Sequence, residues 1–489
     1  MEENSRTLMN VADSGAGYKP RERMCYAVSC VSIVGEPMIA NLLLCRGIRL
    51  IASIMILGIL LCSWAYPYSF ESGTGEPYNP YEISNAEQLM QIGSDLSLMK
   101  KSFILTSDID LDPNLPGGRI FRTAVIAHSV DEDRSNLSDP LIVRAGGVAV
   151  AVFQGTFTGN GHSIRNMTID APSGKCIGLF GYVGNDAVIN DLRIENASVV
   201  GERHVGLLAG INNGTISYSS CSGSIFGNNR AGGLIGTSRG RVTCCQSKTR
   251  VTGKQIVGGL IGHALSKSSI IDCQSKGNVT GESDIGGLIG EMLTGTVIGC
   301  SASGHVSSQT NAGGLVGGGP YGGAIVRCRS SAEIRGALVG GLVGIAQHTN
   351  IMHCHATGVL TGIRPTGKIL DHMAGVGGLV GYWKASKGSI TSSCWDREAH
   401  IMGASAVDVA VAGRSPGAKV RLISTKGATI AQIRTASGPA ACLTNLKVAA
   451  RFKQKKQRSR GRTNRSRKKD LDAQEMRPHA KAILDQPDF

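Results

Sequence analysis

The sequence predicts an all-β fold, a right-handed parallel β-helix made of three-strand coils of about 27 residues. One phrase, Gly-Gly-Leu-(Ile or Val)-Gly or a close variant, occurs eight times, and its closing glycines are 29, 26, 26, 28, 27, 27 and 37 residues apart. Each unit holds three short apolar segments separated by Gly, Ser and Asn, whereas a helix would need an apolar repeat over about ten residues or more. A composition with 66 glycines and 4% aromatic residues fits a solenoid better than a compact enzyme. The closing glycines are Gly181, Gly210, Gly236, Gly262, Gly290, Gly317, Gly344 and Gly381.

A cysteine closes the second segment of several units, and these cysteines predict a column that faces the core. Side chains two apart in a strand share a face, and Cys273 and Cys328 follow Ile271 and Val326 at that distance. Because Leu192 fills the same slot in an earlier unit, we interpret the thiols as small hydrophobic side chains. A metal or disulfide ladder is the alternative. The predicted column comprises Cys221, Cys245, Cys273, Cys300, Cys328 and Cys354, and Cys394 extends it less regularly.

The N-terminal part, residues 1–65, has the features of an export signal. Arg46 and Arg49 precede a 12-residue apolar run from Leu50 to Leu61, and Ser63-Trp64-Ala65 provides a small-x-small site. This pattern predicts a secretory signal cleaved after Ala65, and hence a secreted or cell-surface protein. The alternatives are an uncleaved membrane anchor, for which the run is short, and a buried core segment.

The next part, residues 66–102, is predicted to hold a linker and a short capping helix. The sequence Ser84-Asn85-Ala86-Glu87 has the pattern of a capping box with serine as the cap. Such a helix would cover the open end of the first coil, whose unpaired strands would otherwise template aggregation. The β-helix itself is predicted over residues 103–396, with the eight phrases within 178–381 and a polar loop at 128–147.

No cofactor is expected, and the weak candidates for a metal site are Asp108, Asp110 and Asp112. Oxygen ligands at alternate positions resemble the beginning of a calcium loop. However, Pro113 replaces the glycine expected at the sixth position, and Arg119 replaces the glutamate expected at the twelfth. A solvated strand end and turn is the favoured interpretation.

The repeated phrases and the cysteine segments that follow them resemble the GLUG motif of secreted and surface proteins. The approach Tyr81–Leu89, the Asp108–Leu111 strand and the Phe153–His162 segment resemble the region that accompanies such arrays, so the resemblance covers roughly residues 79 to 396. It implies a parallel β-solenoid at the cell surface, often used for adhesion, without a defined enzymatic activity. Some long GLUG proteins also carry a zinc peptidase domain, but this sequence has no His-Glu-x-x-His.

Parallel β-helices can also be polysaccharide lyases or hydrolases, which need clustered carboxylates on adjacent coils. The outward columns that flank the cysteines contain a single acid, Asp272, so no catalytic residues are assigned. The predicted function is therefore non-catalytic adhesion or binding of an extracellular ligand such as a glycan or matrix component. The alternative is a carbohydrate-active enzyme, a lyase or hydrolase, whose site lies on another face.

The C-terminal segment, residues 397–489, contains a basic tail at 447–469 that is predicted to be disordered. Twelve Lys or Arg residues lie in this tail, and without them the formal net charge falls from +15 to about +3. The tail could bind a polyanion, remain a solvated extension without a partner, or be non-native sequence. Without interleaved aromatic residues it is not expected to recognise nucleic acid specifically. The candidate polyanion-binding residues are Lys453, Lys455, Lys456, Arg458, Arg460 and Arg462.

Overall fold

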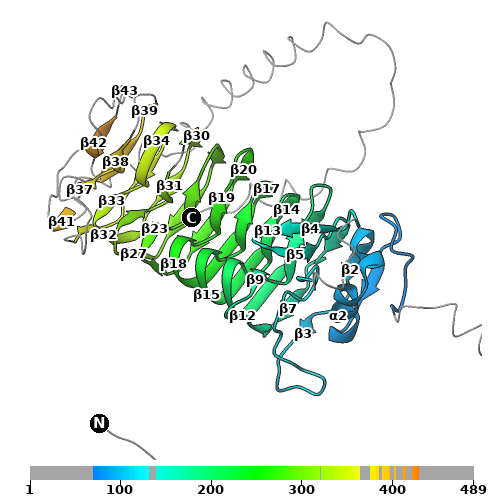
Figure 1. Ribbon diagram of the computed structural model, residues 1–489. Helices are drawn as coiled ribbons and strands as arrows, with labels where there is room; N and C mark the ends of the chain where they lie inside the picture. The colour runs from blue at the N-terminus through cyan, green and yellow to red at the C-terminus, as the bar shows by residue number, and fades with distance from the viewer. Residues whose placement is uncertain are drawn as a thin grey trace, which may run out of the picture. The chain divides into compact units, whose positions relative to one another are not determined.

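The computed structural model shows, over its described residues, a parallel β-solenoid of about eight turns with a repeat near 27 residues and one short α-helix, which confirms the predicted fold class (Figure 1). The predicted export signal within residues 1–65 and the basic tail at 447–469 lie outside the described part of the chain. No helix among the described residues is long and apolar enough to cross a membrane. The structure describes residues 70–130, 139–319, 321–363, 375–384, 388–396, 401–403, 411–414, 421–423 and 425–428.

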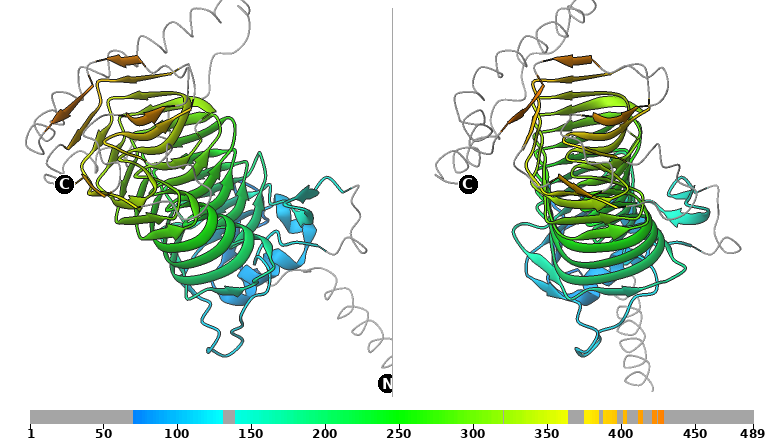
Figure 2. Two further views of the ribbon diagram at one scale, coloured as in Figure 1. Left: turned by 60° about the vertical axis from the view of Figure 1, so that its left-hand side comes forward. Right: turned by 90° about the vertical axis from the view of Figure 1, so that its left-hand side faces the viewer.

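Each turn contributes strands to three faces, and the strands of these faces pair in parallel with their equivalents one turn away (Figure 2). The first face begins inside the signature phrase, where an apolar pair such as Leu288 and Ile289 enters the core. Its strands are β10 (Phe180–Val183), β13 (Ala209–Asn212), β16 (Ile235–Ser238), β19 (Ile261–Ala264), β24 (Ile289–Met292), β29 (Val316–Gly318), β34 (Val343–Met352), β38 (Val380–Trp383) and β42 (Val411–Arg414).

The second face carries the segment that leads to each cysteine, and β34 continues into it from the first face. Its strands are β1 (Tyr81–Ile83), β2 (Ser102–Leu105), β6 (Thr156–Thr158), β11 (Val188–Asn190), β14 (Thr215–Ser217), β17 (Arg241–Thr243), β20 (Ser268–Ile271), β25 (Gly295–Ile298), β30 (Tyr321–Val326), β39 (Ser389–Thr391) and β43 (Arg421–Ile423).

The third face is the longest and returns the chain to the next phrase. In three successive turns it is a single 13-residue strand: β12 (Arg193–Val205), β15 (Ser220–Gly232) and β18 (Gln246–Gly258). Elsewhere it is divided into β3 (Ile109–Asp110), β7 (Ser163–Arg165), β8 (Thr168–Asp170), β9 (Lys175–Ile177), β21 (Gln274–Lys276), β22 (Val279–Gly281), β23 (Ser283–Gly286), β26 (Ser301–Ser303), β27 (His305–Ser308), β28 (Asn311–Gly313), β31 (Arg329–Ser330), β32 (Glu333–Gly336), β33 (Leu338–Gly340), β35 (His355–Ala356), β36 (Leu360–Gly362), β37 (Gly375–Gly377), β40 (Cys394–Asp396), β41 (Ile401–Gly403) and β44 (Lys426–Ala428).

A left-handed residue stands immediately before each cysteine between the second and third faces. Asp272 has φ 52° and Arg327 has φ 54°, a conformation that ends the strand and turns the chain sharply. The two-residue alternation breaks at this corner, so the buried residue is three before the cysteine, as at Ile270. The prediction that Ile271 and Val326 face the core is therefore wrong, because both side chains are half-buried.

The predicted capping helix is α2 (Ala86–Ser94), followed by the 3₁₀ helix η1 (Leu96–Lys100), and it lies at one end of the solenoid (Figure 1). Its cap is Asn85 rather than Ser84: the Asn85 side chain accepts from the Gln88 backbone N–H at 3.0 Å. Gln88 Oε1 in turn accepts from the Ser84 backbone N–H at 2.8 Å. The cap therefore lies one residue later than predicted, and the reciprocal bond of Gln88 reaches the residue before the cap rather than the cap itself.

The segment predicted as a polar loop at 128–147 instead contains the beginning of an antiparallel hairpin, β4 (Ile142–Ala145) and β5 (Val148–Ala151). Val150 packs with Cys176 and Ile211 in a small hydrophobic cluster on the outside of the solenoid. The hairpin thus covers an apolar part of the solenoid surface.

Candidate functional site

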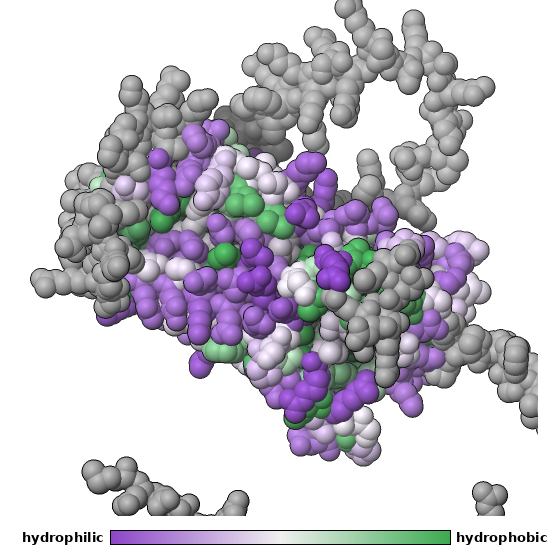
Figure 3. All heavy atoms as spheres, viewed as in Figure 1, coloured by the Kyte–Doolittle hydropathy of each residue, from purple (hydrophilic) through white to green (hydrophobic). Residues whose placement is uncertain are grey.

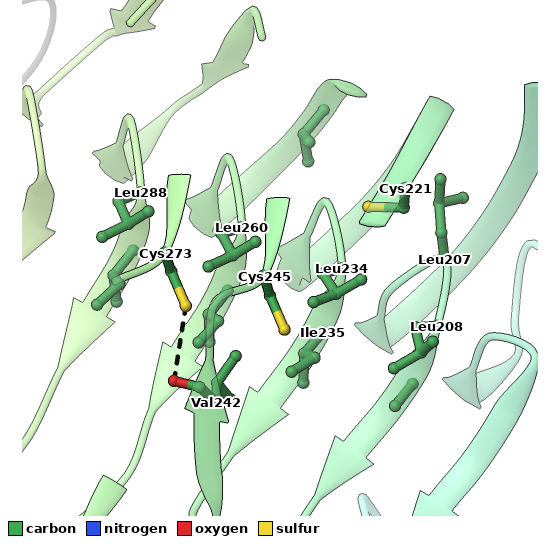
Figure 4. Close-up of a cluster of buried hydrophobic side chains, with 14 of the residues drawn as sticks. Leu207, Leu208, Cys221, Leu234, Ile235, Val242, Cys245, Leu260, Cys273 and Leu288 are labelled. Atoms are coloured by element: carbon green, nitrogen blue, oxygen red, sulfur yellow. Dashed lines mark hydrogen bonds between the residues drawn. The ribbon is translucent and has the colours of Figure 1, made fainter. Parts of the chain in front are cut away.

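Five consecutive turns place a buried cysteine at the corner between the second and third faces: Cys245, Cys273, Cys300, Cys328 and Cys354. Each Sγ donates to the backbone carbonyl two residues earlier, at 3.3, 3.3, 3.4, 3.3 and 3.2 Å respectively. Figure 4 shows Cys245 and Cys273 on neighbouring turns, with Cys273 Sγ 3.5 Å from the Val242 carbonyl oxygen. The column therefore caps the left-handed corners as well as filling the core.

Serine takes the same position at either end of this column. Ser219 Oγ donates to the Ser217 carbonyl at 2.9 Å, and Ser393 Oγ donates to the Thr391 carbonyl at 3.0 Å. The interpretation of the thiols as small hydrophobic side chains is thus incomplete, because the position also uses a hydrogen-bond donor.

Cys221 and Cys394 lie outside this column, so their predicted assignment to it is wrong. In strand register Cys221 lies beside Ser247, and Cys394 lies beside His355. The left-handed corner residues in these turns are Tyr218 and Ser392, so the serine that follows each of them occupies the column. Cys221 is still buried, and burial raises the pKa of its thiol to about 12.

The predicted metal candidates Asp108, Asp110 and Asp112 organise turns rather than a shared centre. Asp108 accepts from the Ser163 backbone N–H at 2.8 Å and from the Arg165 guanidinium at 2.6 Å. Asp110 and Asp112 each accept from the backbone N–H two residues later, both at 2.9 Å. Within the described part of the chain, no group of three or more His, Cys, Asp or Glu side chains is placed to hold a metal ion.

Polar side chains from two columns interlock along the first face. The first column consists of corner residues, each two positions before the first glycine of a phrase, as Arg230 is before Gly232. The second column consists of the residues that directly follow the closing glycine of the next phrase, as His263 follows Gly262. The columns lie so close that a Cβ on Gly262 would stand 2.6 Å from the carbonyl carbon of Arg230. We name as the polar seam the corner residues His204, Arg230, Asp284 and Asn311 with the first-face residues Thr237, His263 and Glu291.

The seam contains a pair of carboxyl groups, Asp284 and Glu291. Asn311 donates a hydrogen bond to Asp284, and Glu291 Oε2 lies 3.5 Å from His263 Nε2. Burial raises the pKa of both carboxyl groups, and the charge of Asp284 further raises the pKa of Glu291. The sequence did not reveal this pair, because Asp284 and Glu291 are seven residues apart in one repeat and the faces outside the cysteine columns are dominated by Gly, Ser, Thr and Asn. The positions of the two acids relative to the phrase, Asp284 before its first glycine and Glu291 after its closing glycine, could have identified the pair.

Two histidines of the seam are almost fully buried. His204 Nδ1 lies 2.8 Å from Thr237 Oγ1. Burial, followed by the charge of Arg230, lowers the pKa of His204 to about 3 and that of His263 to about 4. Both imidazoles are therefore neutral at pH 7 and can accept as well as donate a hydrogen bond.

The outer side of the third face carries ladders of hydroxyl and amide groups. Thr252 pairs in register with Thr280, and Thr280 with Ser307, one per turn. Gln274 Nε2 donates to Ser301 Oγ of the next turn at 3.3 Å. Figure 3 shows hydrophilic residues over much of the face around β15, β18 and β27.

The motif that recurs through these turns is recognisable by comparison with known protein families. The model of the GLUG motif matches residues 255–280 and 336–361, which run from the third face of one turn through the signature phrase to the third face of the next. This solenoid carries GLUG motif repeats. Each matched GLUG segment includes a phrase and a column cysteine, Cys273 or Cys354, so the cysteine column is part of the repeat. The corner residues of the two segments, Ile256 and Leu338, are apolar, so the polar seam is not common to every repeat.

Beyond the GLUG repeats, the chain shows a distant homology to halomucin from Haloquadratum walsbyi (strain DSM 16790 / HBSQ001). The two are 31% identical over 158 residues, which is 32% of this chain but 2% of halomucin, so the chain spans a small part of that protein. Among solved structures, a candidate immunoglobulin A1 protease from Bacteroides ovatus aligns with a TM-score of 0.37 and 18% identity, over 76% of this chain and 91% of the other.

Proposed function

We propose that this GLUG repeat solenoid is a non-catalytic secreted or cell-surface protein that binds an extracellular ligand, a glycan or matrix component, in an adhesive role. The observation that carries the proposal is the outward column of the third face, where Thr252, Thr280 and Ser307 follow one another in register. Phe226, 46% exposed, lies in the same column one turn before Thr252. An exposed aromatic ring next to a line of hydroxyl groups offers both apolar and hydrogen-bonding contacts to a saccharide.

A binding screen tests this proposal. Purified protein is applied to immobilised neutral polysaccharides, acidic polysaccharides and matrix proteins, and Phe226→Ala is compared with wild type. Because Phe226 is exposed, this variant should keep its fold and weaken ligand binding by about fivefold or more. Tyr218→Ala is the matched control, since Tyr218 is 59% exposed at the other end of the third face. An equal effect of both variants, or no binding to any material, would contradict the proposal.

The export part of the proposal rests on the predicted signal before Ala65. Tagged full-length protein is expressed in a bacterial host, and the exported fraction is examined by N-terminal sequencing. A mature chain that begins at Tyr66 supports secretion, and an uncleaved chain in the membrane fraction supports a tethered surface protein. Retention in the cytoplasm would overturn the surface role.

A carbohydrate-active enzyme is the second candidate, and the Asp284 and Glu291 pair is the observation that favours it. Neighbouring carboxyl groups with raised pKa values are the groups that glycoside hydrolysis uses as acid and base. Release of reducing sugar from a polysaccharide panel, lost in Glu291→Gln but not in Glu333→Gln, would establish this activity. Glu333 is the matched control because it is exposed on the third face.

A further inference from the structure

Basic side chains gather where the polar seam begins. Arg203, Arg230 and Arg239 stand close enough to His204 and His263 for their charges to lower the pKa of one or both rings. Burial lowers the pKa of Arg230, and the charge of Arg203 lowers it further because two guanidinium groups repel each other, whereas the charge of Glu291 acts in the opposite direction. Like charges brought together in this way are stabilised when an anion lies between them.

Several polar atoms of this cluster are buried without a hydrogen-bond partner. His263 is 4% exposed, and neither of its ring nitrogens makes a hydrogen bond with a described residue. The Nε atoms of Arg203 and Arg230 are buried and unpartnered in the same way. Because buried polar groups are nearly always satisfied in folded proteins, four such atoms in one cluster indicate that they bind a ligand.

The charges of the cluster favour an anion over a cation. Glu291 approaches only the Nε2 edge of His263, at 3.5 Å, and leaves the Nδ1 edge unpaired. The hairpin of β4 and β5 closes the other end of the cluster, where a Cβ on Gly146 would stand 2.9 Å from the His204 ring. The cluster is therefore bounded by the hairpin at His204 and by Glu291 at His263.

We propose that Arg203, Arg230 and His263 form a binding site for one oxyanion group, a carboxylate or sulfate, carried by an acidic saccharide. The inference rests on the extracellular binding function proposed above and specifies the class of its ligand. The guanidinium groups of Arg203 and Arg230 supply paired N–H donors that match the planar or tetrahedral oxygens of such a group. His263 donates one further N–H from the first face.

Titration calorimetry on the full chain tests the site with three probes. These are sodium sulfate, a tetrasaccharide of a uronic acid polymer, and the same tetrasaccharide with its carboxyl groups reduced to alcohols. Sulfate and the acidic tetrasaccharide should bind, and the reduced one should bind at least about tenfold more weakly, since a charge-assisted hydrogen bond is lost.

Variants then locate the site. Arg230→Met and His263→Asn should each weaken both anionic probes by about tenfold or more. Arg241→Met removes the same charge from the exposed second face and should change binding less than about twofold. Thermal unfolding of each variant confirms that it is folded, and Arg230→Lys should restore part of the affinity.

The outcomes separate this inference from the general binding function. If saccharides bind but acidic and reduced forms bind equally, the anion site is overturned while the adhesive function stands. If sulfate binds through Arg230 but no saccharide does, the oxyanion site stands, whereas its assignment to an acidic saccharide and the proposed function fail. Absence of sulfate binding, or sulfate binding unchanged in Arg230→Met, overturns the site.

Discussion

At the scale of single residues, a left-handed corner decides which side chains reach the core. Asp272, Arg327 and His353 all have positive φ values, although none is a glycine. Each is followed by a buried cysteine whose thiol bonds the carbonyl on the other side of the corner. The strain of the left-handed residue is thus compensated by a side chain built into the repeat.

Substitutions at two neighbouring residues of β20 test this geometry. Ile270→Asp places a charge in the core and should prevent folding, because an unpaired buried carboxylate costs several kcal/mol. Ile271→Asp lies on the half-buried outer side and should cost about 1 kcal/mol. Circular dichroism and urea unfolding measure both. Unfolding by Ile271→Asp with tolerance of Ile270→Asp would contradict the assignment.

Acid sensitivity provides a second test at this scale. His204 has a pKa of about 3 in the folded protein, well below the value near 6.5 of the unfolded chain, so below pH 6.5 the unfolded state binds more protons. The resulting stability is complete above pH 6.5 and is lost as the pH falls. Between pH 7 and pH 5 the contribution of His204 to this loss should be about 2 kcal/mol, so the total loss should be smaller by about that amount in His204→Asn than in the wild type, where His263 adds its own contribution.

The control for this experiment is His305→Asn, which alters an exposed histidine on the third face. Urea unfolding at the two pH values gives the free energies of unfolding. A pH dependence that is the same in the wild type and in His204→Asn would show that His204 is not responsible for it.

The sequence pattern predicts the burial of the cysteines but not the orientation of the residues before them. An apolar strand ending in cysteine repeats in each unit, so the inward slot is visible without a structure. The left-handed corner is indicated by residue type at Gly299 and more weakly at Asp272, but not at Arg327, so the sequence does not mark the corner consistently along the repeat. The two-residue alternation of a strand, extended across the corner, therefore predicted that Ile271 and Val326 face the core, whereas both lie on the outer side.

At the scale of elements, the N-terminal helix is held by its cap and by the side chains that it buries. Leu89 and Ile92 of α2 are fully buried in the main core, against the end of the ladder of the second face. Asn85 caps the helix, and Gln88 bonds back to the Ser84 backbone N–H. The sequence located this helix correctly, but Ser84 and Asn85 are both good caps, and only the backbone geometry decides between them.

Removal of the cap should loosen this helix. Asn85→Ala should lower the free energy that holds α2 folded by about 1 kcal/mol, whereas Ser84→Ala should cost a few tenths. Hydrogen–deuterium exchange followed by mass spectrometry on the peptide that contains α2 measures the difference. Faster exchange in Ser84→Ala than in Asn85→Ala would show that Ser84 is the cap, as the sequence predicted, and would contradict the assignment of Asn85.

At the scale of the whole molecule, the solenoid is a stack of turns that contact mainly their neighbours. Gly258 lies in register with Gly286, so one turn separates them. The period of the phrases was sufficient to predict this architecture. The hairpin of β4 and β5 could not be predicted from this period, because it occurs once among the described residues and is not part of the repeat. The polar seam could not be predicted either, because it depends on which corner residue contacts which first-face strand of the next turn.

Deletion of a complete turn tests this modularity. Removal of residues 259–286 joins Gly258 to Gly287 and preserves the phase of every remaining strand, so the variant should fold with an unchanged circular dichroism spectrum per residue. Removal of residues 259–272 is the control, because it deletes the first-face and second-face strands of one turn and joins one third-face strand directly to the next, so the turn cannot close. Equal folding of the two variants would show that register does not govern the stack.

The strict register of the outward ladders also bears on how a long ligand would be held. Consecutive turns repeat every 4.7–4.9 Å or so, like any paired strands, so Thr252, Thr280 and Ser307 form a lattice with one lattice point per turn. A polymer whose own repeat matches this spacing or a multiple of it can add one weak contact for each unit laid along the column. Its avidity then grows with chain length, and a monomer of the same polymer competes only at a concentration orders of magnitude higher.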